Sequence, residues 1–214
     1  MLLKEEGESN MFLNEARINE VKDILYHCYQ TDVSFPRSCG TVSMVLAYLF
    51  ELSDLSDEYE ITYERGHYRN ENEEEWCEEL SLDFQRGDNL ENFPCFNCNC
   101  DYMVGHSWIE LVSKIDQEIF ILDFTSIQFE EDFGDYHEEL LDSDHDKDSL
   151  YDYISRRSKF VIDNTDWRFN HYINSERTRT GKELVRTVKE TIEENCTSML
   201  TVTLERMGYL PTND

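Results

Sequence analysis

The amino-acid sequence predicts an α+β fold in which a buried helix, beginning at Cys39, packs on an antiparallel sheet. Nearly every residue of the segment 42–50 is apolar, and a helix that is apolar on all sides is a buried one. Apolar and polar residues alternate over 59–68, which is typical of a half-buried strand. Two further strand-like segments, 105–112 and 118–125, are separated by a short polar turn and complete the predicted sheet.

The chain before this sheet is predicted to hold two helices joined by a loop. Apolar residues recur at helical spacing through 11–29, which indicates an amphipathic helix. The segment 31–37 is predicted to be a loop, and Pro36 within it helps to stop any continuing helix. Ser38 stands where an N-cap is needed, because a serine hydroxyl accepts a hydrogen bond from the N–H groups of the first turn. The buried helix should therefore meet the surface of the core at Cys39.

The remaining segments are predicted to decorate this core. Residues 70–104 have an acidic first part and a cysteine-rich second part, and we interpret them as an insertion. Asp and Glu dominate 130–149, which indicates a solvated loop or an acidic helix face. A short strand is predicted near 159–162, and apolar residues at helical spacing predict a helix over 181–195.

Length and composition indicate one domain. The 214 residues are 39% hydrophobic and 13% aromatic, which is enough for a sizeable core. We therefore expect a single domain over 1–214, with its core over 11–130, the insertion over 70–104, and a C-terminal acidic and helical extension over 131–214.

The charge balance restricts the partners that the protein can have. There are 47 Asp and Glu against 19 Lys and Arg, for a net charge of −28. This excess repels phosphate backbones and anionic lipid surfaces, so we expect neither nucleic acid nor a membrane as a partner. It would suit a basic protein partner, or an acidic surface that imitates nucleic acid, although a carboxylate-rich, highly hydrated surface explains it without any partner.

The seven cysteines and the absence of long apolar runs indicate a cytoplasmic protein. Because seven is odd, at least one cysteine is outside any intramolecular disulfide. The N-terminus carries no apolar segment of the kind found in secretory signals, and no run approaches the roughly 20 apolar residues that cross a bilayer. A reducing compartment is the simplest account of this cysteine usage.

The segments 105–110 and 121–125 can place a histidine beside an aspartate. If residues 113–116 form a four-residue turn, His106 stands directly opposite Asp123, with Cβ atoms about 5 Å apart. Such a carboxylate would accept a hydrogen bond from Nδ1 of the imidazole and leave Nε2 free as a base. The same two residues would also serve as a half-buried pair that stabilises the sheet, and by themselves they favour that interpretation.

A thiol at Cys39 could act as a nucleophile that the His106–Asp123 pair activates. A thiol at a helix N-terminus feels the positive end of the helix dipole, which favours the thiolate. Gly40 leaves room for a substrate, and the backbone N–H of Cys39 is an unpaired first-turn donor that could hold an oxyanion. An ordinary buried cysteine is the alternative. Together with His106 and Asp123, however, the thiol forms a set of nucleophile, base and orienting carboxylate.

Three motifs of the chain resemble the papain-like and transglutaminase-like superfamily of thiol enzymes. They are Ser38-Cys39-Gly40-Thr41, Gly105-His106-Ser107-Trp108-Ile109-Glu110 and Ile121-Leu122-Asp123-Phe124-Thr125. The resemblance implies a central helix that opens with the nucleophile Cys39 and packs on an antiparallel sheet carrying the base His106 and the orienting Asp123. It further implies acyl transfer at amide bonds of a protein or peptide, as in a peptidase, a glutamine deamidase or a transglutaminase, with no cofactor.

The chain departs from that family's pattern around the cysteine. The aromatic residue that often follows the nucleophile is replaced by Gly40 and Thr41. Gln30 is the candidate for a side chain in the oxyanion hole, although it lies farther before Cys39 than in papain-type enzymes, and its position favours a surface glutamine instead.

Residues near His106 offer further candidates. On a regular strand Trp108 and Glu110 share the face of His106. Trp108 could shield the pair from water, line a substrate cleft or simply pack in the core, and Glu110 could pair with a cation or be solvated. His67, at the end of its strand, is a reserve candidate for the base.

A cysteine cluster in the insertion raises the question of a metal. Cys95, Cys98 and Cys100, with Cys77, offer four thiolates, the number of a closed zinc site. The usual pair of C-x-x-C motifs is missing, so we predict no metal and interpret these residues as free thiols, with zinc or a redox switch as alternatives.

Three functions follow from these observations. The first is a thiol-dependent acyl-transfer enzyme. The second is a non-catalytic acidic protein that engages a basic partner or blocks a nucleic-acid site. The third is an adaptor stabilised by zinc.

Overall fold

The computed structural model describes residues 12–31, 35, 38–69, 103–129, 139–140, 143–174, 178–194 and 196–210. Its α-helices are α1 (Glu15–Thr31), α2 (Cys39–Glu51), α3 (Leu55–Glu58), α6 (Lys147–Ser155), α7 (Gly181–Glu193) and α8 (Met199–Arg206). Its strands are β1 (Tyr59–Arg69), β2 (Met103–Ser113), β3 (Ile119–Leu122), β4 (Val161–Asp163), β5 (Tyr172–Asn174) and β6 (Arg179–Thr180). Two short 3-10 helices are η3 (Ser126–Phe129) and η4 (Trp167–His171). None of the helices in the described part of the chain has the length and apolarity needed to span a membrane.

The strands form one antiparallel sheet. Its order is β4-β3-β2-β1-β5, and β6 pairs with a separate part of β1. The two longest strands, β1 and β2, pair over their whole length, from Tyr59 opposite Ser113 to Arg69 opposite Met103. The predicted combination of helices with an antiparallel sheet is therefore confirmed.

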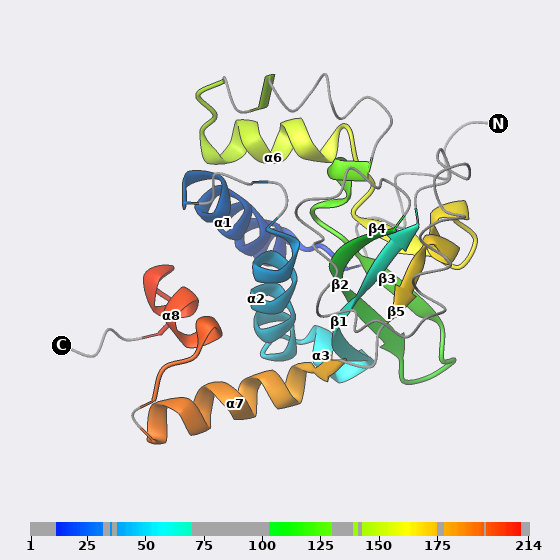
Figure 1. The fold of residues 1–214 in the computed structure, drawn as a ribbon. Helices are drawn as coiled ribbons and strands as arrows, with labels where there is room; N and C mark the ends of the chain where they lie inside the picture. Colours follow the sequence, from blue (N-terminus) through cyan, green and yellow to red (C-terminus); the bar gives the residue numbers. More distant parts are fainter. Residues whose placement is uncertain are drawn as a thin grey trace, which may run out of the picture.

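Helix α2 is the central element (Figure 1). It packs on β1 and β2 of the sheet and also contacts α1, α7 and α8. Every residue from Val42 to Phe50 is buried, as the apolar run predicts. The first turn differs, because Cys39 and Gly40 are only half-buried. The start of α2 is thus less buried than the middle of the helix.

The predicted side-chain cap of α2 does not form. Ser38 occupies the N-cap position, but its side chain makes no capping hydrogen bond, and its hydroxyl is buried with no partner among the described residues. Its backbone does not have the extended conformation usual for an N-cap, which explains why the hydroxyl misses the first-turn N–H groups. Another serine ties the helix to the sheet, because Ser43 Oγ donates to the carbonyl oxygen of Ser107 at 2.9 Å.

The boundaries of several elements differ from the predicted ones for local reasons. Helix α1 begins at Glu15 rather than at 11, because the side chain of Asn14 accepts a hydrogen bond from the N–H of Arg17 at 3.0 Å. Strand β3 ends at Leu122 rather than at 125, because the side chain of Asp123 accepts a hydrogen bond from the N–H of Thr125 at 2.9 Å and starts a turn there.

The C-terminal segments belong to the core rather than decorating it. Strand β4 extends the sheet beside β3, and both β5 and β6 pair with β1. Helix α7 packs against α2, and its start is fixed by a capping box of Thr180 and Glu183. A core limited to 11–130 therefore omits half of the strands. The predicted insertion also ends earlier than 104, since Met103 already belongs to β2, while residues 70–102 lie outside the described residues.

Candidate active site

The sheet presents two differently covered faces. Ile61, Ile109 and Leu111 point toward the helices and join the main core. A smaller cluster of Tyr68, Trp108, Ile121, Ile162 and Tyr172 forms on the other face. Because side chains alternate along a strand, His106 shares this second face with Trp108. Its neighbour Ser107 faces α2.

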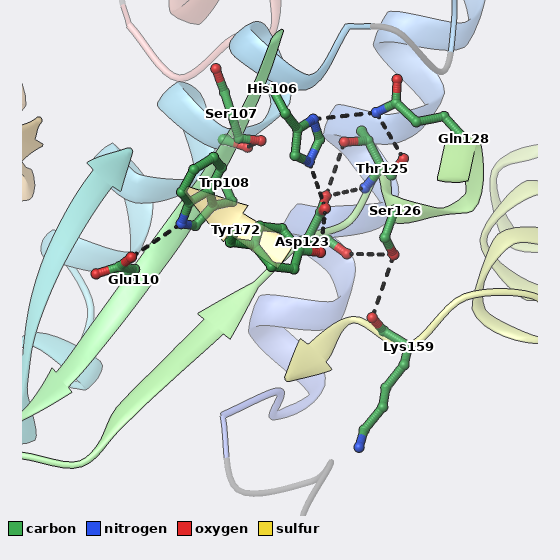
Figure 2. Close-up of polar contacts among 11 residues, drawn as sticks. His106, Ser107, Trp108, Glu110, Asp123, Thr125, Ser126, Gln128, Lys159 and Tyr172 are labelled. Carbon is green, nitrogen blue, oxygen red and sulfur yellow. Dashed lines mark hydrogen bonds and ion pairs between the residues drawn. The ribbon is translucent and has the colours of Figure 1, made fainter. Parts of the chain in front are cut away.

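His106 and Asp123 meet on the second face. His106 Nε2 lies 2.6 Å from Asp123 Oδ2, and neither side chain has any exposed surface. Figure 2 shows the two side chains pointing at each other from β2 and from the turn after β3. A hydrogen bond this short between buried groups of opposite charge is strong and directional.

The two residues pair diagonally rather than directly. Ile109 is opposite Leu122, so the predicted register is displaced by two residues. The turn occupies 114–117 instead of 113–116 and is closed by a hydrogen bond from Ser113 N to Glu118 O at 2.8 Å. A displacement of two residues keeps every side chain on its predicted face, since the period of a strand is two. His106 and Asp123 therefore still meet, as diagonal neighbours.

The ring nitrogen that contacts the carboxylate is not the predicted one. Asp123 bonds Nε2 of His106, so Nδ1 is the atom left for other partners. The side-chain nitrogen of Gln128 lies 3.4 Å from Nδ1 and donates to the carbonyl oxygen of Thr125 at 3.1 Å. Figure 2 shows Gln128 on the side of the ring away from Asp123. Any proton that His106 accepts from a neighbouring group must therefore arrive at Nδ1.

Hydrogen-bond donors surround the carboxylate of Asp123. Thr125 donates to Oδ1 from its N–H at 2.9 Å and from its hydroxyl at 3.0 Å. The hydroxyl of Tyr172 on β5 donates to Oδ2 at 2.9 Å. Burial alone would raise the pKa of Asp123, but His106 and these donors lower it, so the carboxylate stays ionised. Burial and the charge of Asp123 raise the pKa of Tyr172 well above its ordinary range, which keeps this tyrosine a donor.

Cys39 approaches the same histidine from the start of α2. Burial would lower the pKa of His106, but the charges of Asp123 and Cys39 and side-chain hydrogen bonds with both residues raise it to about 10. The thiol is the half-buried member of the three, whereas His106 and Asp123 are buried. The structure thus brings all three residues together, and Cys39 is the one of the three that is not fully buried.

Aromatic rings enclose the histidine. The ring of Trp108 stacks at 6.0 Å between centroids and 25° between planes, and Phe129 meets His106 edge-on at 4.7 Å and 88°. Trp108 is fully buried and donates from Nε1 to Glu110 at 3.3 Å. Trp108 has no exposed surface, and its position is that of a shield behind His106. Glu110 accepts a second bond from Asn174 at 3.0 Å.

The other predicted candidates are not among the described contacts of this site. Gln30 is exposed near the end of α1, and none of the described contacts of Cys39 or His106 involves it. The backbone of His67 pairs with Gly105. The zinc candidates Cys77, Cys95, Cys98 and Cys100 lie outside the described residues. Within the described ranges, no group of three or more His, Cys, Asp or Glu side chains is placed to hold a metal ion.

Sequence reasoning missed three residues of the site. Thr125 follows Asp123 in an Asp-x-Thr pattern, which is a known signal for a side chain that bonds the backbone two residues on. Gln128 and Tyr172 carried no such signal, because nothing local to either residue points to His106 or Asp123.

The pKa of His106 predicts how stability depends on pH. A pKa raised from its ordinary 6.5 to about 10 means that the folded state holds the proton more tightly than the unfolded state. The resulting stability is complete below pH 6.5 and is lost as the pH rises through about 10. We expect the urea midpoint to fall between pH 7 and pH 10, and the midpoint of His106→Gln to depend less on pH over that interval. Parallel curves for the two proteins would contradict the assigned charge state.

Comparison with models of known protein families, with curated proteins and with solved structures gives no match, so the case for a function rests on the geometry of this site.

Proposed function

We propose that the protein is a thiol-dependent acyl-transfer enzyme that attacks the carbonyl carbon of an amide bond through Cys39. The observation that carries the proposal is a buried His106–Asp123 pair beside a half-buried thiol at a helix N-terminus. A pair that only stabilised the sheet would need no thiol next to it. The likeness of the three motifs to papain-like and transglutaminase-like enzymes supports the same assignment.

The chemistry follows from the atoms that face each other. Before attack the thiol proton already resides on Nδ1 of His106, whose pKa is raised to about 10, and the sulfur of Cys39 then forms a bond to the carbonyl carbon. Asp123 holds the Nε2–H and stabilises the charged imidazole. When the tetrahedral intermediate collapses, the C–N bond breaks and His106 Nδ1–H protonates the departing amine. The backbone N–H of Cys39, at the start of α2, is available to the carbonyl oxygen.

The second half of the reaction defines the product. A thioester joins Cys39 to the acyl group, and either water or a second amine attacks it. Attack by water makes the enzyme a peptidase or a glutamine deamidase, and attack by an amine makes it a transglutaminase. The substrate class is a protein or peptide, and the cycle needs no cofactor because every proton moves between His106 and the reactants.

Thiol alkylation tests this proposal. At neutral pH, iodoacetamide is expected to modify Cys39 faster than the exposed Cys196 or the buried Cys28, with the modified residue identified by peptide mass spectrometry. His106→Ala should lower the rate at Cys39 by about 100-fold, because the thiol loses its base. His27→Ala, on α1, is the control and should leave the rate unchanged.

Two further observations complete the test. His106→Gln is a second variant, in case the alanine protein does not fold, and circular dichroism reports whether each variant retains its structure. If Cys39 reacts no faster than Cys196, and His106 variants have no effect, acyl transfer is contradicted. The net charge of −28 would then favour the acidic binding protein.

A further inference from the structure

Two hydroxyl groups meet beside Gly40, the residue that follows Cys39 in the first turn of α2. A methyl group added at Gly40 would lie 3.7 Å from the hydroxyl oxygen of Tyr63 and 3.9 Å from the hydroxyl oxygen of Ser107. These are ordinary van der Waals contacts, so the missing side chain leaves a gap of about one methyl group at the first turn of α2. Tyr63 on β1 and Ser107 on β2 border this gap.

The two hydroxyls form a buried hydrogen-bonded pair. Their oxygens are 3.3 Å apart, and the two residues are only 7% and 4% exposed. Either oxygen could be the donor by geometry. If Ser107 donates to Tyr63, the single proton of the tyrosine hydroxyl is free to bond another acceptor, and it is polarised by the serine behind it.

Tyr63 is suited to donate rather than to ionise. Burial raises the pKa of its hydroxyl, against the lowering effects of the Ser107 hydrogen bond and of Arg65. The charge of Cys39 raises it further. A neutral donor in a site of low polarity strengthens its hydrogen bond to a developing anion without a cost of reorganisation.

We propose that the hydroxyl of Tyr63 donates a hydrogen bond to the oxyanion that forms when Cys39 attacks a carbonyl group, and that the gap at Gly40 admits this oxygen. This inference rests on the proposed function and adds the side chain that the oxyanion site lacked. The backbone N–H of Cys39 supplies the second donor. Ser107 acts through Tyr63 and is a positioning residue.

Acylation by p-nitrophenyl acetate measures the effect of this donor. The sulfur of Cys39 forms a thioester with the acetyl group, the ester C–O bond breaks, p-nitrophenolate leaves, and the thiol proton passes to His106. Tyr63→Phe should slow this step at Cys39 by about 100-fold, as expected for the loss of one oxyanion donor. Ser107→Ala should lower the acylation rate by a smaller factor.

Tyr59→Phe is the matched control, because Tyr59 is also a buried tyrosine of β1 but packs against Phe12 and Phe120.

Alkylation separates a role at the oxyanion from a general role in the fold. Iodoacetamide reacts with the thiolate by displacement at carbon, and no oxyanion forms. Tyr63→Phe should therefore be alkylated at Cys39 within about two-fold of the parent rate. Equal losses in acylation and alkylation, or an unchanged acylation rate, would each overturn the inference. If alkylation of the parent does not depend on His106, the proposed function itself has failed, which is a distinct result.

Gly40→Ala tests the gap without removing any hydrogen bond. The new methyl group fits at contact distance, and alanine favours a helix more than glycine does, so the melting temperature should not fall. Because the methyl group occupies the space assigned to the oxygen, acylation should still drop by at least about 10-fold. A variant that acylates at the parent rate would show that the oxygen binds elsewhere.

Discussion

Replacing Asp123 with asparagine is expected to destabilise the fold by about 3–5 kcal/mol and to slow alkylation of Cys39 by about 1,000-fold. The reason is that every partner of this carboxylate is a donor. Thr125 donates twice to Oδ1, and His106 and Tyr172 donate to Oδ2. An amide group has one acceptor oxygen and one donor nitrogen, so its nitrogen must face a donor whichever way it turns.

In both orientations, the amide group of the asparagine is also expected to lower the reactivity of Cys39. If the amide nitrogen faces His106, the ring proton must move to Nδ1, and that atom can no longer accept the thiol proton. If it faces Thr125, two hydrogen bonds of the turn are lost. If the ring instead keeps its charge, that charge is buried without its counter-ion, which is among the largest single costs in folded proteins.

A second Asp-x-Thr turn in the same chain provides the control. Asp163 accepts hydrogen bonds from the N–H of Thr165 at 2.7 Å and from its hydroxyl at 2.6 Å, but it lies near the surface and has no histidine partner among its described contacts. Asp163→Asn should change the free energy of unfolding by less than about 1 kcal/mol and leave alkylation unchanged. Urea unfolding that shows equal effects for the two variants would contradict a special role for the buried pair.

The central helix and the longest strands could be predicted because their signals are local. The apolar run from Val42 to Phe50 is typical of a buried helix, and the structure buries every one of these residues. Alternation along β1 and β2 placed Tyr63 and His106 on strands. The predicted register was displaced by two residues, but His106 and Asp123 still meet, because an even displacement keeps each side chain on its predicted face.

The position of the turn could not be predicted because it depends on an unusual backbone. Gln117 has a positive φ of 65°, a conformation that favours glycine or asparagine. The hydroxyl of Ser113 accepts hydrogen bonds from the N–H groups of Ile115 and Asp116 at 3.3 and 3.4 Å, which stabilises the turn one residue later than predicted.

Contacts between segments that are distant in the sequence could not be predicted either. Tyr172 lies on a three-residue strand, which is too short for any periodic pattern, yet its hydroxyl bonds Asp123. The hydroxyl of Tyr63 meets Gly40 only after α2 has packed on β1. Such positions depend on tertiary packing, which no local pattern encodes.

Replacing Gly66 with alanine is expected to destabilise the fold by about 3 kcal/mol, because the sheet leaves no room for a side chain there. Gly66 on β1 is opposite His106 on β2 and Asn174 on β5. A methyl group would lie 1.9 Å from the carbonyl oxygen of Ile173 and 2.8 Å from Cη2 of Trp108. The first contact is with backbone, so β5 itself must move away from β1.

That movement should also reduce the reactivity of the thiol. Displacing β5 carries the hydroxyl of Tyr172 away from Asp123, and pressure on Trp108 moves the ring that stacks on His106. Urea unfolding and alkylation of Cys39 should therefore both be impaired in Gly66→Ala, whereas Gly40→Ala, the same substitution in an open position, should keep its stability. A Gly66→Ala protein with the parent's urea midpoint would mean that β5 is not held against β1, and the support of Asp123 by Tyr172 would have to be abandoned.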